Sequence, residues 1–192
     1  MAFIDTIPEG RASDELAALY DDERARMGIL PNYVRAFSAR PEVYRAWQQL
    51  NGTIKQHDVR RYELATLAAA RALRSSYCAL AHGKVLAEQF YDPATVPSLP
   101  AGLDEADAAV MAFAEKVARD ATSVEQEDVD RLRRLGLADE EILDVALAAA
   151  ARSFFSKTLD ALGVQPDAAY AELEPALRDA LTVGRPIELP HA

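Results

Sequence analysis

Alanine, leucine, glutamate and arginine dominate the chain, and these residues favour helices. Runs of β-branched residues are missing, and so are Asn-Gly turn signals between alternating strands. Apolar residues instead recur at the spacing of one helix face, as in Val110, Phe113, Ala114 and Val117. The sequence therefore predicts an all-α fold.

Capping residues, prolines and glycines divide the chain into predicted helices. Ser13 and Asp104 are N-cap candidates, and Ser123 with Gln126 has the spacing of a capping box. Gly136 is placed to end the helix that this box opens. The predicted helices cover residues 14–28, 31–37, 41–55, 61–73, a segment around 78–82, a segment from 104 onward, 123–136, 139–163 and 166–181, followed by an arm or loose tail after 184.

One domain over residues 1–192 is the simplest organisation, because 192 residues, half of them hydrophobic, can bury one sizeable core. The segment between Asp92 and Leu103 holds three prolines and a glycine, which favours a linker and an internal boundary. Two tightly fused helical repeats, 14–91 and 104–181, are therefore a possible arrangement within that domain.

An internal repeat is indicated because residues 63–75 superpose without gaps on residues 141–153, with Glu63 on Glu141. Extended by the same offset, the alignment pairs two reactive positions with different residues: Cys78 with Ser156, and His82 with Asp160. Only the first copy then carries the groups for thiol chemistry.

Charge and apolar content exclude several classes of protein. The net charge is −10 and no basic run is present, so nucleic acid is a poor partner. The opening residues 1–5 lack the basic start and apolar core of a signal peptide, and the most apolar stretch, 145–151, is too short to span a bilayer. A single cysteine forms no intrachain disulfide, so we expect a reducing compartment, most simply the cytoplasm, and no membrane.

Cys78 and His82 are the best candidates for chemistry. Residues four apart on a helix share a face, so the thiol and the imidazole can meet. An imidazole can take the thiol proton, and the thiolate is the reactive form. This pair predicts an activated nucleophile.

Glu63 can join them if the chain folds back. It lies fifteen residues before Cys78, which on one unbroken helix is about 22 Å. Ser75 offers a break, because serine prefers a helix start, and it would make Cys78 the third helical residue, favoured as a thiolate by the helix dipole. The expected result is a relay from the Glu63 carboxylate through His82 to the thiol.

Each of these residues also has a purely structural interpretation. Cys78 can be a small buried residue, and His82 a packed core histidine. Glu63 can pair with Arg60 or Arg61 on the surface. Of the accessory candidates, Ser75 is better explained as a helix cap than as an acid–base group, and Tyr77 either lines the pocket or belongs to the core.

Other chemistries lack their signatures. No Cys-x-x-Cys or His-x-x-x-His pair supports a metal site, and Gly-x-Ser-x-Gly is missing. The eight glycines do not cluster into a phosphate-binding loop. We therefore expect neither a metal nor a cofactor.

These residues resemble the alkylhydroperoxidase D-like and carboxymuconolactone decarboxylase superfamily, in particular its peroxidase-related branch. That family has a glutamate, a Cys-x-x-Cys pair and a histidine four residues after the second cysteine; Glu63, Cys78 and His82 match. The flanks 27–32, 41–42, 135–144 and 162–164 look like the branch's opening and closing segments. The resemblance covers a core of about 14–170 and implies an alkylhydroperoxidase D-like multi-helix bundle that assembles as a homo-oligomer, a trimer or hexamer.

One departure qualifies the implied activity: Ser75 stands where the family has its first cysteine. The resemblance implies a peroxidase-type, peroxiredoxin-like oxidoreductase, with Cys78 the redox nucleophile, His82 its base and Glu63 orienting His82. The substrate would be a small hydroperoxide, and an external thiol would resolve the oxidised cysteine. The alternatives are a cofactor-free carboxymuconolactone decarboxylase-like enzyme using His82 and Glu63, and a non-catalytic oligomer that kept only the fold.

Overall fold

The computed structural model describes residues 2–189. That part of the chain contains helices and no strand, which confirms the all-α fold class. Its helices are α1 (Asp14–Met27), α2 (Asn32–Ala36), α3 (Pro41–Lys55), α4 (Val59–Ala72), α5 (Ser76–Gln89), α6 (Glu105–Asp120), α7 (Gln126–Arg134), α8 (Asp139–Ala161) and α9 (Pro175–Leu181).

Several helix ends follow the local signals read from the sequence. The Ser13 side chain accepts a hydrogen bond from the Leu16 backbone N–H, and the Asp104 side chain accepts one from the Asp107 N–H. Gly28 follows α1 with a φ of 76°, in the left-handed region that glycine enters at no steric cost. The predicted starts of α1 and α6 are therefore confirmed.

Two predicted boundaries are wrong. The box that opens α7 uses Asp128, whose carboxylate accepts from the Glu125 backbone N–H, while Ser123 belongs to a preceding 3-10 turn. The predicted helix over 166–181 is reduced to α9, because residues 168–172 form a 3-10 turn and Glu174 caps a new start at Pro175. At α7 the Asp128 carboxylate forms the box in place of Ser123. At α9 Pro175, which has no backbone N–H, occupies the first turn, so the helix does not run through it from residue 166.

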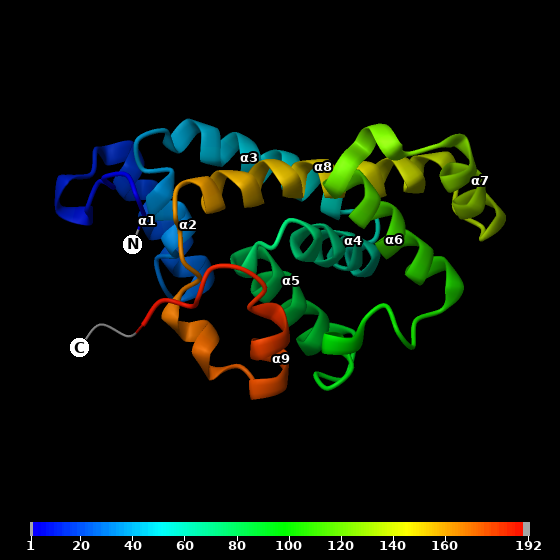
Figure 1. The fold of residues 1–192 in the computed structure, drawn as a ribbon. Helices are drawn as coiled ribbons and strands as arrows, with labels where there is room; N and C mark the ends of the chain where they lie inside the picture. Colours follow the sequence, from blue (N-terminus) through cyan, green and yellow to red (C-terminus); the bar gives the residue numbers. More distant parts are fainter. Residues whose placement is uncertain (1, 190–192) are drawn as a thin grey trace.

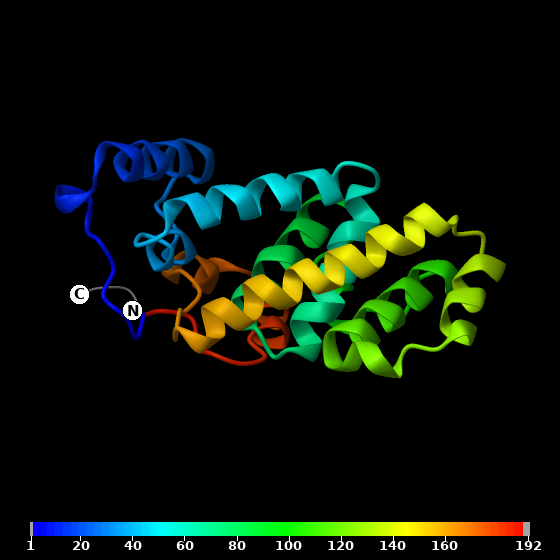
Figure 2. The same ribbon diagram turned by 90° about the horizontal axis from the view of Figure 1, so that it is seen from above.

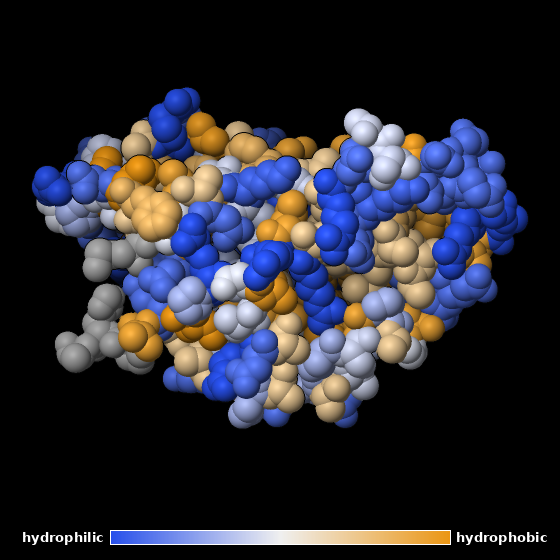
Figure 3. Space-filling view, in the orientation of Figure 1, coloured by the Kyte–Doolittle hydropathy of each residue, from blue (hydrophilic) through white to orange (hydrophobic). Residues whose placement is uncertain are grey.

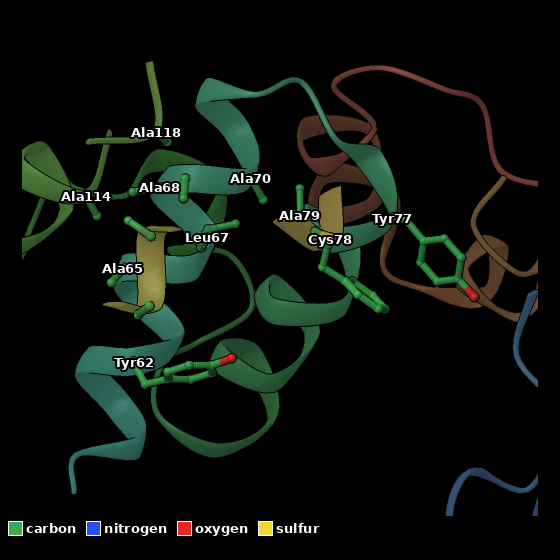
Figure 4. Packing of buried hydrophobic residues seen from close by; sticks show 14 of the residues in the cluster. Tyr62, Ala65, Leu67, Ala68, Ala70, Tyr77, Cys78, Ala79, Ala114 and Ala118 are labelled. Atoms are coloured by element: carbon green, nitrogen blue, oxygen red, sulfur yellow. The ribbon is translucent and has the colours of Figure 1, made fainter. Parts of the chain in front are cut away.

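Helix α4 lies at the centre of the molecule, and every residue from Tyr62 to Ala70 is buried. Helices α3 and α8 run side by side over α4 and α5, as Figure 1 and the view from above in Figure 2 show. Small side chains allow the neighbouring helices to approach: Figure 4 shows Ala68 of α4 near Ala114 and Ala118 of α6, all buried. A helix buried on every face can carry a buried polar group only if a partner satisfies it.

On the face seen in Figure 3, hydrophilic residues gather over α7 at one end, and hydrophobic residues lie among polar ones elsewhere. No helix within residues 2–189 combines the length and the apolar character needed to cross a membrane.

The proline-rich segment between α5 and α6 is held against α4. The Arg71 guanidinium donates to the carbonyl oxygens of Val96 and Leu99, at 2.9 and 2.8 Å. Residues 96–98 form a 3-10 turn there, although the composition favoured a linker without regular structure. The arginine thus links the backbone of this irregular segment to α4.

The tail after 184 lies against the turn between α4 and α5. The Gly184 backbone N–H donates to Ser76 Oγ at 2.7 Å, and Arg74 Nε donates to the Val183 carbonyl at 3.3 Å. The segment is thus an arm docked on the fold as far as the description reaches; residues 190–192 of the predicted tail lie outside the described residues.

Candidate functional site

A sharp break separates α4 from α5. Arg74 has a φ of 57°, a left-handed conformation that costs a residue with a Cβ roughly 1–2 kcal/mol. The Ser75 backbone N–H donates to the Ala70 carbonyl at 2.9 Å, and α5 then starts at Ser76. Cys78 is the third residue of α5, as predicted, where the helix dipole favours a negative charge.

The fold-back brings Glu63 of α4 to His82 of α5. Glu63 Oε2 lies 2.6 Å from His82 Nδ1, and Glu63 Oε1 lies 2.5 Å from Lys55 Nζ. The Glu63 side chain is fully buried, whereas that of Lys55 is 36% exposed. This is the carboxylate–imidazole contact that the spacing predicted, with a lysine added to it.

The arginines next to Glu63 in sequence have other partners. Arg60 donates to Asp107, and Arg61 donates to Asp107 and, at 2.6 Å, to Glu141. These arginines connect α4 to α6 and α8. The surface pairing of Glu63 with Arg60 or Arg61, the structural alternative, is therefore wrong.

Protonation states follow from this pairing. Burial raises the pKa of Glu63, but His82 and Lys55 together lower it by a larger amount, so the pKa is about 2. Burial lowers the pKa of His82 below its ordinary 6.5, and the nearby Arg152 lowers it too, against the opposing effect of Glu63. An ionised carboxylate only accepts hydrogen bonds, so Nδ1 carries the proton of a neutral ring. Nε2 is then left as a proton acceptor near neutral pH.

The thiol of Cys78 is bound by Arg152 of α8. The Arg152 guanidinium donates to Cys78 Sγ at 3.4 Å and to the Tyr62 hydroxyl at 3.2 Å, and Tyr62 in turn donates to Asn51. Within residues 2–189 no hydrogen bond joins Sγ to His82. The i, i+4 spacing predicted a direct hydrogen bond between the thiol and the imidazole. The structure shows instead that His82 Nδ1 faces Glu63 and that the Arg152 guanidinium donates to the sulfur.

Arg152 is a buried cation, 3% exposed, and no carboxylate in the described part of the chain forms an ion pair with it. The rings of Trp47 and Phe155 lie beside it, with centroids 5.4 and 5.6 Å from Cζ. Burial lowers the pKa of Arg152, but the contacts with Cys78 and Tyr62 raise it by a larger amount, so the pKa is raised overall. A buried cation is stabilised by an opposite charge, and a thiolate formed at Cys78 would supply one.

Cys78, His82 and Arg152 line a cavity of about 420 Å³. Its wall includes several aromatic residues, with Phe155 stacked on Trp47 at a centroid distance of 4.8 Å. No carboxylate is among the lining residues, although Arg26, Lys55 and Arg152 are. A cavity of this size admits a small organic molecule, and its charged lining is cationic.

The two accessory candidates lie at the start of α5. Ser75 occupies the N-cap position and is fully buried, but its hydroxyl makes no capping hydrogen bond. Tyr77 lines the cavity with its ring, and its hydroxyl donates to Asp167. Figure 4 shows Tyr77 and Cys78 leaving the first turn of α5 in different directions, with Tyr77 pointing away from α4.

Three residues of the site were not among the sequence candidates: Lys55, Tyr62 and Arg152. An arginine beside the apolar run 145–151 was the one visible signal, since a cation on the buried face of a helix needs a partner. Lys55 gave no signal, because a lysine at a helix end is ordinary. No group of three or more His, Cys, Asp or Glu residues in 2–189 could hold a metal ion.

No family model matches the sequence, and no curated protein is similar to it. Solved structures do share its fold. An uncharacterized peroxidase-related protein from Ralstonia eutropha JMP134, with an alkylhydroperoxidase AhpD core, superposes with a TM-score of 0.79 at 21% identity, over 88% of this chain and 94% of that one. A peroxidase-related protein from Silicibacter sp. TM1040 gives 0.76 at 22% identity, over 88% and 91%.

A third neighbour is the debrominase Bmp8, with a TM-score of 0.72 at 18% identity, over 92% of this chain and 96% of that one. A cysteine-to-alanine variant of Bmp8 has been solved with 2,3,4-tribromopyrrole. The chain thus has the alkylhydroperoxidase AhpD-core fold, as the resemblance implied, and proteins of this fold include an enzyme.

Proposed function

We propose that this protein, a member of the AhpD-core fold, reduces small hydroperoxides through Cys78. The observation that carries the proposal is the buried guanidinium of Arg152, which donates to Cys78 Sγ at 3.4 Å and can stabilise a thiolate formed there. His82 serves as the base and Glu63 orients it, because the 2.6 Å contact at Nδ1 leaves Nε2 as the acceptor. Buried, paired ionisable groups around a cavity are typical of catalytic sites.

The proposed reaction transfers two electrons. Cys78 gives its proton to His82 Nε2, through the bound hydroperoxide or a water, and the thiolate attacks the terminal peroxide oxygen. An S–O bond forms while the O–O bond breaks, and the departing alkoxide takes the proton from His82. Cys78 becomes a sulfenic acid and the hydroperoxide becomes an alcohol. Neither a metal nor a cofactor is needed.

Regeneration requires a thiol from outside the chain, because the sequence has one cysteine and Ser75 stands at the other motif position. The first external thiol condenses with the sulfenic acid to give a mixed disulfide and water. A second thiol releases Cys78 and leaves as a disulfide. The cycle thus consumes two thiols for each hydroperoxide.

Hydroperoxide consumption by the Cys78→Ser variant is the direct test. We expect wild type to reduce cumene hydroperoxide in the presence of an excess thiol and Cys78→Ser to fall to the uncatalysed rate, with Ser75→Ala as the matched control that keeps activity. Equal rates for wild type and Cys78→Ser would refute the proposal. Activity of Cys78→Ser on a carboxymuconolactone-type substrate would favour the decarboxylase alternative, in which Cys78 is incidental.

Reductive dehalogenation of a small halogenated aromatic compound is a second candidate. Two observations favour it: the aromatic wall formed by Trp47 and Phe155, and the similarity of fold to a debrominase. The thiolate would attack the halogen, the ring carbon would take a proton, and an external thiol would then release halide and form a mixed disulfide. Release of bromide from 2,3,4-tribromopyrrole, absent in Cys78→Ser, distinguishes this activity from the first.

Self-association stays a prediction that the surface of α8 supports. Leu143, Leu147 and Phe154 lie on one face of this helix and are 56%, 39% and 48% exposed. Large apolar side chains at helical spacing on an exposed face favour an interface. Light scattering coupled to gel filtration would give the number of subunits, and a monomer would contradict the expected trimer or hexamer.

A further inference from the structure

Resting on the proposed function, we propose that the reductant is a low-molecular-weight thiol carrying a carboxylate, which enters through the same cavity as the hydroperoxide. The alternative donor for a chain with one cysteine is a redox protein that presents its own thiol pair. Two features of the site favour the small thiol: how Cys78 is enclosed, and which charges line its cavity.

The chain's own arm closes the side of α5 where a second motif thiol would sit. Ser75 and Ser76 are fully buried. Gly184 donates to Ser76 Oγ at 2.7 Å, and a Cβ at position 184 would lie only 1.9 Å from the Arg74 carbonyl oxygen. This packing leaves no room for a partner's thiol to reach the first turn of α5 from that side.

The remaining approach to Cys78 is through the cavity. The Cys78 residue is 2% exposed, and the cavity that it lines measures about 420 Å³, in the range of small-ligand sites. Thiol–disulfide exchange brings two sulfurs to a bond length of about 2.05 Å. A surface cysteine of a protein brings its backbone with it, and the rings of Trp47 and Phe155 already fill much of the wall. A small thiol carries no protein backbone and can pass beside these rings.

The charges of the cavity select among small thiols. Arg26 and Lys55 line it together with Arg152, and no carboxylate does. The carboxylates that pair with the first two, Glu23 and Glu63, are 2% and 0% exposed and lie behind them. An anionic thiol therefore meets cations whose side chains are 54% and 36% exposed, in a protein whose overall charge is −10.

The chemical steps are those of exchange. The attacking thiolate forms an S–S bond with Cys78, displacing water from the sulfenic acid or a leaving thiolate from a mixed disulfide. A second small thiolate then attacks the outer sulfur, and Cys78 departs as a thiolate bound by Arg152. Two electrons pass from two small thiols to Cys78, and the products are water and their disulfide.

Two assays keep this inference separate from the proposed function. In the first, the protein is treated with cumene hydroperoxide, and sulfenic acid at Cys78 is trapped with dimedone and detected by mass spectrometry; its absence refutes the proposed function. In the second, Cys78 is converted to its S-methylthio disulfide with methyl methanethiosulfonate. The rate of its reduction is then measured with mercaptoacetate, 2-mercaptoethanol, cysteamine and a thioredoxin, whatever the first assay gives.

Each rate, at equal thiolate concentration, is divided by the rate of the same thiol with the S-methylthio disulfide of free cysteine, which removes its intrinsic nucleophilicity. On this scale we expect mercaptoacetate to reduce the S-methylthio protein about tenfold faster than cysteamine, with 2-mercaptoethanol between them. At the same concentration the thioredoxin should be slower than mercaptoacetate. Arg26→Gln should narrow the preference about threefold, and Arg45→Gln, which changes an arginine outside the cavity, should leave it unchanged. Faster reduction by cysteamine or by thioredoxin would overturn the inference.

Discussion

The hairpin formed by α4 and α5 and the corresponding stretch of α8 place similar sequences in different geometries. In the hairpin the chain breaks at Arg74, so Glu63 and His82, nineteen positions apart, are in contact. Helix α8 runs unbroken from Asp139 to Ala161, so Glu141 and Asp160 lie about 28 Å apart along the axis. The break, more than the residues that the two stretches share, creates the site.

The surroundings of the two glutamates, Glu63 and Glu141, also differ in burial and in charge. Glu63 is fully buried, while the Glu141 side chain is 41% exposed and binds Arg61 at 2.6 Å. The cavity beside Cys78 has a cationic lining, whereas a second cavity of about 320 Å³, beside Glu141, is lined by four carboxylates: Asp58, Glu140, Glu141 and Asp144. The comparison predicts that the proposed thiol chemistry is confined to the hairpin, and four experiments test it.

The largest effect is expected from the two matched glutamates. Glu63→Gln removes the charge that orients His82, so kcat/KM for a hydroperoxide should fall about 100-fold. Glu141→Gln should leave activity within about twofold and change the free energy of unfolding by less than about 0.5 kcal/mol, because its ion pair is exposed. Steady-state kinetics and urea denaturation measure both. Equal losses of kcat/KM in the two variants would contradict the prediction that only the hairpin forms an active site.

A smaller loss is expected for the cation that binds the thiol. Arg152→Met removes the guanidinium from Cys78, so alkylation of the native protein by iodoacetamide at pH 7 should slow about tenfold, the effect of roughly 1.4 kcal/mol of lost thiolate stabilisation. Lys157→Met, an exposed change on the same helix, is the control and should alkylate at the wild-type rate. Unchanged alkylation in Arg152→Met would show that the thiolate does not depend on this contact.

Acid should destabilise the hairpin in two windows. The folded-state pKa of His82 lies below 6.5 and that of Glu63 is about 2, against 4.5 ordinarily. For both groups the unfolded state binds more protons, so stability rises with pH. The His82 contribution is lost as pH falls below 6.5, and that of Glu63 between about 4.5 and 2. Between about pH 4.5 and 2 the unfolding free energy should depend less on pH in Glu63→Gln than in wild type, and as in wild type in Glu141→Gln. An equal dependence in both variants would contradict the assignment.

The lowest thiol reactivity is expected when the cysteine is moved to the corresponding position of α8. Ser156 corresponds to Cys78, is fully buried, and its hydroxyl has no hydrogen-bond partner within the described residues. In the double variant Cys78→Ala with Ser156→Cys, the new thiol should react with iodoacetamide only after unfolding and support no hydroperoxide reduction. Mass spectrometry of native and urea-treated protein checks this. A reactive thiol at 156 would mean that α8 offers an activating environment too.

Local patterns predicted much of the fold. The caps at Ser13 and Asp104 depend on contacts within a few residues, which a sequence displays directly. The start of α5 lies where Ser75 predicted it, although the Ser75 hydroxyl makes no capping hydrogen bond. The prediction at Ser123 was wrong because the Asp128 carboxylate forms the box instead. The 166–181 helix was wrong because Pro175 cannot lie inside a regular helix and starts α9. The spacing of Glu63 and His82 predicted their contact only once a break was assumed.

The sequence by itself determined that the chain is all-helical, that thiol chemistry can use only Cys78, and that no second cysteine can resolve it. These conclusions depend on residue type and spacing along the chain. Tertiary structure decided that Arg152, seventy-four residues away, and not His82 is the partner of the thiol, and that Lys55 shares Glu63 with His82. The physical reason is that a buried charged or polar group loses its water and must pair with a group close to it in space. The packing of the helices decides which group that is.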